Sequence, residues 1–280
     1  MDYIISREDI RQFNMHLKIT ERSGATIGQY VRVAGKLYEY SEGKGVSKNS
    51  LLEWKQQLSQ RYAVSSANAY IAAANSFFRF MEWEQFIIKP FKRQKEIFMN
   101  EKKELTKEEY RKLVETACRS GRKRLSLVMQ SICSTGIRIS ELNFITVEAV
   151  KEGRAEVSCK GKRRIVFLPK KLRALLKNYI KEENKITGPV FTSKSGRPLN
   201  RSNIWREMKG LCRYAGVSGE KVYPHNFRYL FAKSYYSMEK DIVKLADLLG
   251  HFNINTTRIY IMESGRKHAQ QIEKLGLIIT

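Results

Sequence analysis

A basic segment without clear periodicity divides the chain into two stretches of helical pattern. It covers residues 88–103, contains Pro90 and is rich in lysine. A proline inside a basic, weakly periodic run is typical of an interdomain linker, because it interrupts regular helices and favours extended backbone. The sequence therefore predicts two domains, at residues 1–87 and 104–280, joined by this linker.

The charge of the chain indicates a polyanionic partner. Its 280 residues include 52 Lys and Arg against 28 Asp and Glu, for a formal net charge of +24. An excess this large and of one sign is more than solubility needs, and it favours binding to nucleic acid. The linker either lies along a phosphate backbone or is merely solvated. The candidate DNA contacts are Lys89, Lys92 and Arg93 in the linker, with Lys162 and Arg163 further along the chain.

The first domain is predicted to be helical throughout. Ser6 and Asp9 resemble an N-terminal cap, and apolar residues at helical spacing follow them. Glycines at positions 43 and 45 interrupt the pattern between two later helices. Four helices are expected, one starting at Ser6 and the others at residues 26–40, 50–62 and 65–83.

The second domain is predicted to be mainly helical with a small β-hairpin. Thr106 and Glu109 form a capping box at its start. Two strands at 154–159 and 164–168 surround a basic tip, and residues 190–192 are expected to supply a third strand. Further helices are predicted at residues 125–134, 171–182, 201–215, 225–237 and 240–249. The fold class is therefore mainly α with a small sheet, in two domains.

Several other kinds of protein do not fit the sequence. No apolar run approaches the roughly 20 residues of a membrane-spanning helix. Acidic residues interrupt the N-terminus early, so it does not read as a signal peptide. The four cysteines, at positions 118, 133, 159 and 212, show neither a close pair nor zinc-binding spacing. We expect a cytoplasmic protein with no membrane association and no metal site.

Two pairs of residues suit the binding of a phosphodiester. Arg138 and Glu141 are three residues apart, so on a helix the carboxylate can hold the guanidinium in place. His225 and Arg228 have the same spacing. Two arginines can clamp the non-bridging oxygens of a phosphate, and a phenol such as Tyr260 could attack it. Either pair alone also fits an ordinary ion pair or a packed histidine.

The ordered combination of these motifs resembles the tyrosine recombinases, the phage integrase family that includes the Xer-type enzymes. Tyr260 follows His251 by nine residues, as the nucleophile of that family follows its Leu-Gly-His motif. The resemblance covers about residues 104–275. The segments that carry it are Thr135-Gly-Ile-Arg138-Ile-Ser-Glu141-Leu142, Val157-Ser-Cys-Lys160-Gly-Lys162, Pro224-His225-Asn-Phe-Arg228, Leu248-Leu-Gly-His251 and Thr256-Thr-Arg-Ile-Tyr260.

The resemblance implies a covalent mechanism on double-stranded DNA. Tyr260 would attack a scissile phosphate, forming a 3′-phosphotyrosyl link and freeing a 5′-hydroxyl. Arg138 and Arg228 would stabilise the phosphorane, with His251 as a further hydrogen-bond donor. Because the energy of the broken bond is kept in the protein–DNA link, the reaction needs no ATP, metal or other cofactor.

The resemblance also assigns the proton transfers. Lys160 would protonate the leaving 5′-oxygen as general acid, with Lys162 as the alternative. His225 would accept the tyrosine proton or bind the phosphate, and Glu141 would orient Arg138.

The chain departs from the family pattern at a few positions. Tyr229 and Cys159 stand where the family commonly has histidine and glycine. Two other tyrosines, Tyr235 and Tyr236, are rivals to Tyr260 as the nucleophile, although packing is the simpler role for them.

The resemblance further implies a SAM-like helical core-binding domain before the catalytic domain, and four protomers assembled on two duplexes. The tail at about residues 264–280 would be exchanged between protomers or would cover its own domain. A partner recombinase or a directionality factor could be needed, and the protein would associate with the nucleoid. The alternatives are a type IB topoisomerase, which religates the original strand, and a catalytically inactive DNA-binding accessory protein.

Overall fold

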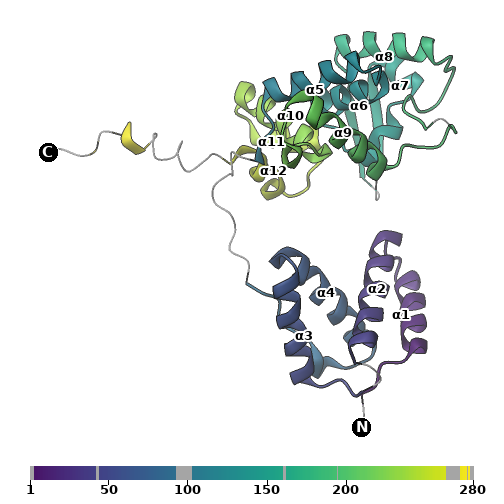
Figure 1. Ribbon diagram of the computed structural model, residues 1–280, viewed down its shortest axis with the longest axis vertical. Helices are drawn as coiled ribbons and strands as arrows, with labels where there is room; N and C mark the ends of the chain where they lie inside the picture. Colours follow the sequence, from purple (N-terminus) through teal and green to yellow (C-terminus); the bar gives the residue numbers. More distant parts are fainter. Residues whose placement is uncertain are drawn as a thin grey trace. The chain divides into compact units, whose positions relative to one another are not determined.

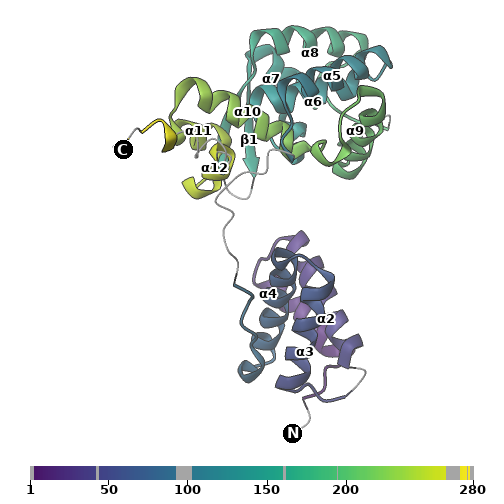
Figure 2. The same ribbon diagram turned by 60° about the vertical axis from the view of Figure 1, so that its left-hand side comes forward.

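The computed structural model describes residues 3–41, 44–92, 103–159, 162–193, 195–262, 272–275 and 277, without the side chains of Cys159 and Lys162. The chain separates into two compact units, Met1–Lys95 and Glu96–Thr280 (Figures 1 and 2). Each unit has its own hydrophobic core. Both units are mainly helical, which agrees with the predicted fold class.

The described part of the first unit contains the four predicted α-helices. Ser6 and Asp9 cap α1 reciprocally, and Ser47 and Ser50 do the same for α3. The last helix ends before the predicted residue 83, because the chain turns through Glu82 with a positive φ of 60°. The elements are α1 Arg7–Ile19, α2 Gly24–Ser41, α3 Lys48–Arg61, α4 Val64–Phe80 and the 3-10 helix η1 Glu84–Phe86.

Aromatic side chains fill the core of the first unit, and two asparagines of α4 hold the segment that leaves it. Phe13 and Phe77 are fully buried, with ring centroids 5.2 Å apart. Asn75 accepts the backbone N–H of Ile88 (2.9 Å) and donates to its carbonyl (2.8 Å). Asn68 pairs in the same way with Phe91. The first residues of the predicted linker are therefore fixed against α4.

The second unit contains the remaining elements. The sequence did not predict α7 and α12, which are both short. The bounds are α5 Lys107–Arg119, α6 Lys123–Thr135, η3 Ile139–Phe144, α7 Val147–Glu152, β1 Arg154–Cys159, β2 Lys162–Phe167, α8 Lys170–Glu182, α9 Arg201–Ala215, η4 Gly219–Lys221, α10 Pro224–Glu239, α11 Ile242–Leu249 and α12 Ile254–Ile261.

Strands β1 and β2 form an antiparallel hairpin. Ala155 pairs with Val166 and Val157 pairs with Arg164. Ala155, Val157 and Val166 are all buried, so this face of the hairpin packs on the core. Because side chains alternate along a strand, Arg164 also lies on the inward face.

Residues 190–192 do not form the predicted third strand. Single bridges join Thr146 to Pro189 and Thr192 to Pro198 at the two ends of this segment. Proline has no N–H to donate, so the bridges do not extend into a ladder. Val190 and Phe191 are nevertheless buried in the core, which explains why their apolar pattern resembled a strand.

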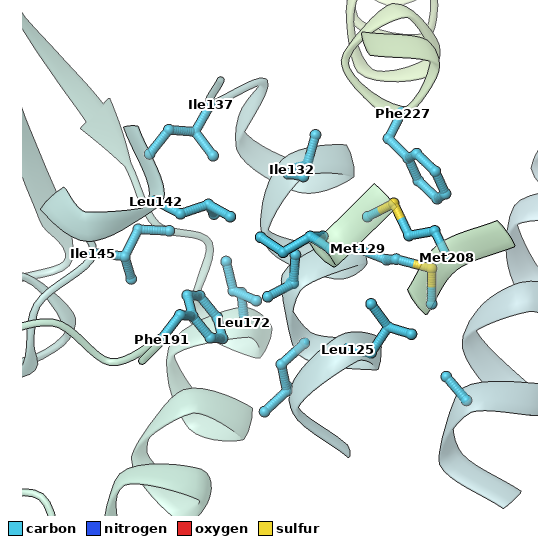
Figure 3. Close-up of a cluster of buried hydrophobic side chains, with 14 of the residues drawn as sticks. Leu125, Met129, Ile132, Ile137, Leu142, Ile145, Leu172, Phe191, Met208 and Phe227 are labelled. Carbon is cyan, nitrogen blue, oxygen red and sulfur yellow. The ribbon is translucent and has the colours of Figure 1, made fainter. Parts of the chain in front are cut away.

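Helix α6 contributes much of the main core of the second unit. Met129 and Ile132 of this helix are fully buried, together with Met208 of α9 and Phe227 of α10 (Figure 3). The side chains that continue this core come from α5, η3, α7, the β-hairpin, α8 and the adjoining loops. In the described part of the chain, no helix is both long and apolar enough to cross a bilayer.

A smaller cluster joins α10, α11 and α12. It contains Ala232, Leu245, Leu249 and Tyr260, all at most 2% exposed. Helix α11 begins two residues later than predicted, because the carboxylate of Asp241 caps it. This cluster attaches the helix that carries Tyr260 to the helix that carries His225 and Arg228.

Candidate active site

Arg138 and Glu141 form an ion pair at the start of η3. The Nη1 of Arg138 donates to Oε1 of Glu141, and its backbone N–H donates to Oε2, both at 2.9 Å. The two residues share the first turn of a 3-10 helix rather than the predicted helix face, because Arg138 itself is the N-cap. The Arg138 side chain is 38% exposed, whereas that of Glu141 is 3% exposed. The carboxylate therefore anchors a guanidinium that can still reach a ligand.

A second arginine, Arg164, binds the other side of Glu141. Its Nη2 donates to Oε2 of Glu141 (2.6 Å) and its Nη1 to the carbonyl of Leu248 (2.7 Å). Burial alone would raise the pKa of Glu141, but the backbone N–H of Arg138 and the charges of both arginines bring it below its usual value. Glu141 is therefore ionised, and Arg164 ties the hairpin to the C-terminal end of α11.

Arg228 is a buried cation held by main-chain carbonyls. It is 2% exposed, and its Nη1 and Nη2 donate to the carbonyls of Gly136 and Leu249. Gly136 ends α6 with a φ of 66°, and a Cβ there would lie 2.5 Å from the ring of Phe231. Burial and the charge of Arg138 lower the pKa of Arg228 to about 10, which leaves it protonated at pH 7.

His251 lies between Arg228 and Thr257. Its Nε2 is 3.0 Å from Nη2 of Arg228, and its Nδ1 is 3.0 Å from Oγ1 of Thr257. Burial and the neighbouring arginines, Arg228 first, lower the pKa of His251 to about 4. The imidazole is therefore neutral at pH 7.

Tyr260 reaches the same place from α12. Its hydroxyl lies 3.3 Å from Nε2 of His225, and its ring stacks on that of His251 with an interplanar angle of 16°. The residue is 2% exposed. Burial and the charges of Arg228 and Arg138 lower the pKa of His225. A neutral His225 can accept the phenol hydrogen of Tyr260 at Nε2.

Two cavities meet at Arg138 and Ser140. The first, of about 460 Å³, is also lined by His225, Arg228 and Trp205. The second, of about 720 Å³, continues to His251 and the hairpin. The exposed guanidinium of Arg138 is thus accessible from both sides, and all the cations around it favour an anion.

The sequence of the second unit matches a known family. The model of the phage integrase family matches residues 103–266, which is more than half of the chain. The chain belongs to the phage integrase family. The predicted resemblance to Xer-like tyrosine recombinases is confirmed.

Relatives of this phage integrase family member match along nearly the whole chain. Tyrosine recombinase XerA of Pyrococcus furiosus is 26% identical over 97% of this chain and 95% of its own length. The fold is shared with XerH bound to its difH substrate (TM-score 0.70, 19% identity), with 96% of this chain and 90% of that chain covered. It is also shared with lambda integrase in a tetramer on a Holliday junction (TM-score 0.74, 17% identity), with 92% of this chain and 78% of that chain covered.

The fold of the phage integrase family brings most of the predicted site together. Five predicted residues line the two cavities, namely Arg138, Glu141, His225, Arg228 and His251. The sixth, Tyr260, contacts His225 and His251. Lys160, Arg93 and most of the tail at 264–280 lie outside the described residues, as does the side chain of Lys162. Among the other predicted DNA contacts, Lys89 and Lys92 are exposed in the first unit, and Arg163 is exposed beside the second cavity.

Two residues of the site were missed by the sequence reasoning. Arg164 lies on the same face of the strand as the buried Val166 and Leu168. An arginine on the inward face of a strand was therefore the sequence signal that could have identified it. Thr257 is fully buried three residues before Tyr260, and nothing in the sequence distinguished it from the exposed Thr256.

Proposed function

We propose that this protein is a site-specific recombinase that cleaves and rejoins double-stranded DNA through a 3′-phosphotyrosyl intermediate. The observation that carries the proposal is the contact between the hydroxyl of Tyr260 and Nε2 of His225, beside the guanidinium groups of Arg138 and Arg228. A nucleophile, a neutral base and two cations for an anionic transition state are thus gathered in one site.

Cleavage proceeds by attack of the Tyr260 oxygen on the scissile phosphorus. His225 accepts the phenol proton at Nε2, since its lowered pKa keeps the imidazole neutral at pH 7. The bond from phosphorus to the 5′-oxygen breaks, and Lys160, or Lys162 in its place, supplies a proton to that oxygen. Religation reverses these steps with a 5′-hydroxyl as the attacking group.

The arginines hold the phosphate during this exchange. Arg138 and Arg228 donate to its non-bridging oxygens, where charge grows as the phosphorane forms. Glu141 orients Arg138 through the two hydrogen bonds described above. His251 donates a further hydrogen bond to the phosphate.

The DNA is bound by both units. Lys89, Lys92 and Arg93 contact the backbone near the first unit, and Lys162 and Arg163 contact it near the cleavage point. Four protomers assemble on two duplexes, by analogy with the lambda integrase tetramer on a Holliday junction. The tail at 264–280 is exchanged between protomers or covers its own domain. A partner recombinase or a directionality factor completes some reactions, and the protein associates with the nucleoid of the cytoplasm.

The test uses duplexes that carry candidate sites and a nick near the expected cleavage point, so that the covalent product accumulates. Binding of each duplex is confirmed first, and denaturing gels then compare the wild type with Tyr260→Phe. Tyr235→Phe and Tyr236→Phe are the matched controls, because they remove the hydroxyl of the rival tyrosines. We expect a covalent band that is absent only from Tyr260→Phe.

Two outcomes would contradict the proposal. A band that persists in Tyr260→Phe would assign another nucleophile, and bound sites that give no band with the wild type would favour the accessory-protein alternative. Two labelled duplexes then separate recombination from relaxation, because a topoisomerase would relax supercoiled DNA without joining strands from different duplexes.

A further inference from the structure

The proposed role of His251 conflicts with the hydrogen bonds that it makes in the free protein. A guanidinium has only donors, so the Nε2 of His251 must accept from Arg228. A neutral imidazole then carries its one hydrogen on Nδ1, which donates to Oγ1 of Thr257. In this state His251 has no hydrogen on Nε2 to offer to a phosphate.

A protonated His251 would donate from both nitrogens, but its surroundings in the free protein disfavour that form. Arg228, Arg138 and Arg164 surround the imidazole, and together with burial they lower its pKa to about 4. A neutral imidazole that donates to DNA carries its hydrogen on Nε2, and its Nδ1 must then accept a hydrogen bond.

Thr257 is suited to both arrangements, because a hydroxyl can accept or donate. Its side chain is fully buried, with Oγ1 3.0 Å from Nδ1 of His251. It also lies three residues before Tyr260 on α12, which places the partner of His251 and the nucleophile on one helix.

We propose that Thr257 is a positioning residue that lets His251 change from acceptor to donor when DNA binds. This proposal rests on the proposed function. When the scissile phosphate enters, Arg228 donates to it instead of to Nε2. His251 releases the proton on Nδ1 to solvent and takes up a proton from solvent at Nε2, so its charge does not change, and the Thr257 hydroxyl turns to donate to Nδ1.

The decisive variants keep the shape of residue 257 and change its hydroxyl. Thr257→Val removes the hydroxyl from a side chain of nearly the same size, and Thr257→Ser retains it. Thr256→Val is the matched control, because it makes the same substitution at an exposed position of the same helix. Cleavage is measured in single turnovers at saturating nicked duplex, and DNA affinity is measured separately.

We expect Thr257→Val to slow cleavage by about tenfold, with DNA affinity within about twofold of the wild type. Thr257→Ser retains most of the rate, and Thr256→Val leaves it unchanged. In a His251→Ala background, Thr257→Val has no further effect, because Thr257 acts only through His251. An equal loss of rate in that background would overturn the proposal and assign Thr257 a general packing role.

A spectroscopic measurement keeps the proposal testable without cleavage. Nitrogen-15 NMR of the imidazoles distinguishes the two neutral tautomers, and His251→Gln assigns the signal. We expect the hydrogen on Nδ1 in the free protein and on Nε2 in a complex of Tyr260→Phe with its DNA. A free protein with the hydrogen on Nε2 would refute the tautomer change, whatever the fate of the proposed function, which the covalent band tests by itself.

Discussion

The two units differ in the polar groups that they bury. In the first unit, the buried polar side chain among the described residues is Asn75, which binds the main chain of Ile88. The second unit buries the charged side chains of Glu141 and Arg228. Burial of a charge costs free energy, whereas an amide with both its partners stabilises the fold. The first unit thus uses its buried polar group for structure, whereas the proposed function gives the buried charges of the second unit a role in chemistry.

The largest expected effect comes from removing the buried charge on α10. We expect Arg228→Met to lower the rate of covalent product formation at least about a thousandfold, because the transition state loses a charged donor. The variant stays folded, since methionine fills the space and relieves the repulsion from Arg138. Rates and circular dichroism melting curves measure the two effects. Arg228→Lys, which keeps the charge but loses the bidentate geometry, serves as the control.

The contrast between a structural role in the first unit and a chemical role in the second would not hold if Arg228→Met unfolded the second unit. The cation would then be needed to satisfy the carbonyls of Gly136 and Leu249, and its role would be structural as well.

A smaller effect, on stability rather than on reaction rate, is expected in the first unit. Asn75→Ala leaves the buried N–H and carbonyl of Ile88 without partners, so it should destabilise this unit by about 1–3 kcal/mol. Urea unfolding followed by the fluorescence of Trp54 and Trp83 measures the loss. Asn68→Ala is the matched control at the part-buried pair with Phe91, and it should cost less. An equal loss of unfolding free energy in both variants would show that burial does not determine how much these amide side chains stabilise the unit.

The smallest effect concerns pH. The pKa of His251 is about 4 in the folded protein, below its usual 6.5, so the unfolded chain binds this proton first as pH falls. Stability should therefore decrease between pH 6.5 and pH 4, by less than about 1 kcal/mol down to pH 5.5 after allowance for solvent screening. The lowered pKa of His225 acts in the same direction.

Melting of the wild type and of His251→Gln across this range measures the pH effect. The variant should lose less stability than the wild type. Identical losses would mean that the arginines do not hold His251 neutral.

Much of the site could be predicted from the sequence because its residues are fixed in short local patterns. The spacing of Arg138 and Glu141 gave the correct pair, although the pair forms in a 3-10 helix. The approach of Arg228 to His251 could only be inferred through the family resemblance, since it depends on how α10 packs beside the turn after α11.

The sequence did not predict features that depend on packing between segments far apart in the chain. Arg164 and Thr257 are bound to partners that the fold alone brings to them, so their roles had no local signal. The apolar run at 190–192 was misread because it is buried without a strand partner. Short helices such as α7 lack the length over which periodicity can be recognised.

The turn at Gly250 limits how this site can vary among homologous proteins. Its φ of 64° favours glycine, and a Cβ there would lie 2.4 Å from the Arg164 side chain. A substitution at Gly250 would displace the Arg164 side chain and strain the backbone beside His251. We therefore expect single substitutions at position 250 to be disfavoured during evolution. Gly250 and Arg164 should be conserved together.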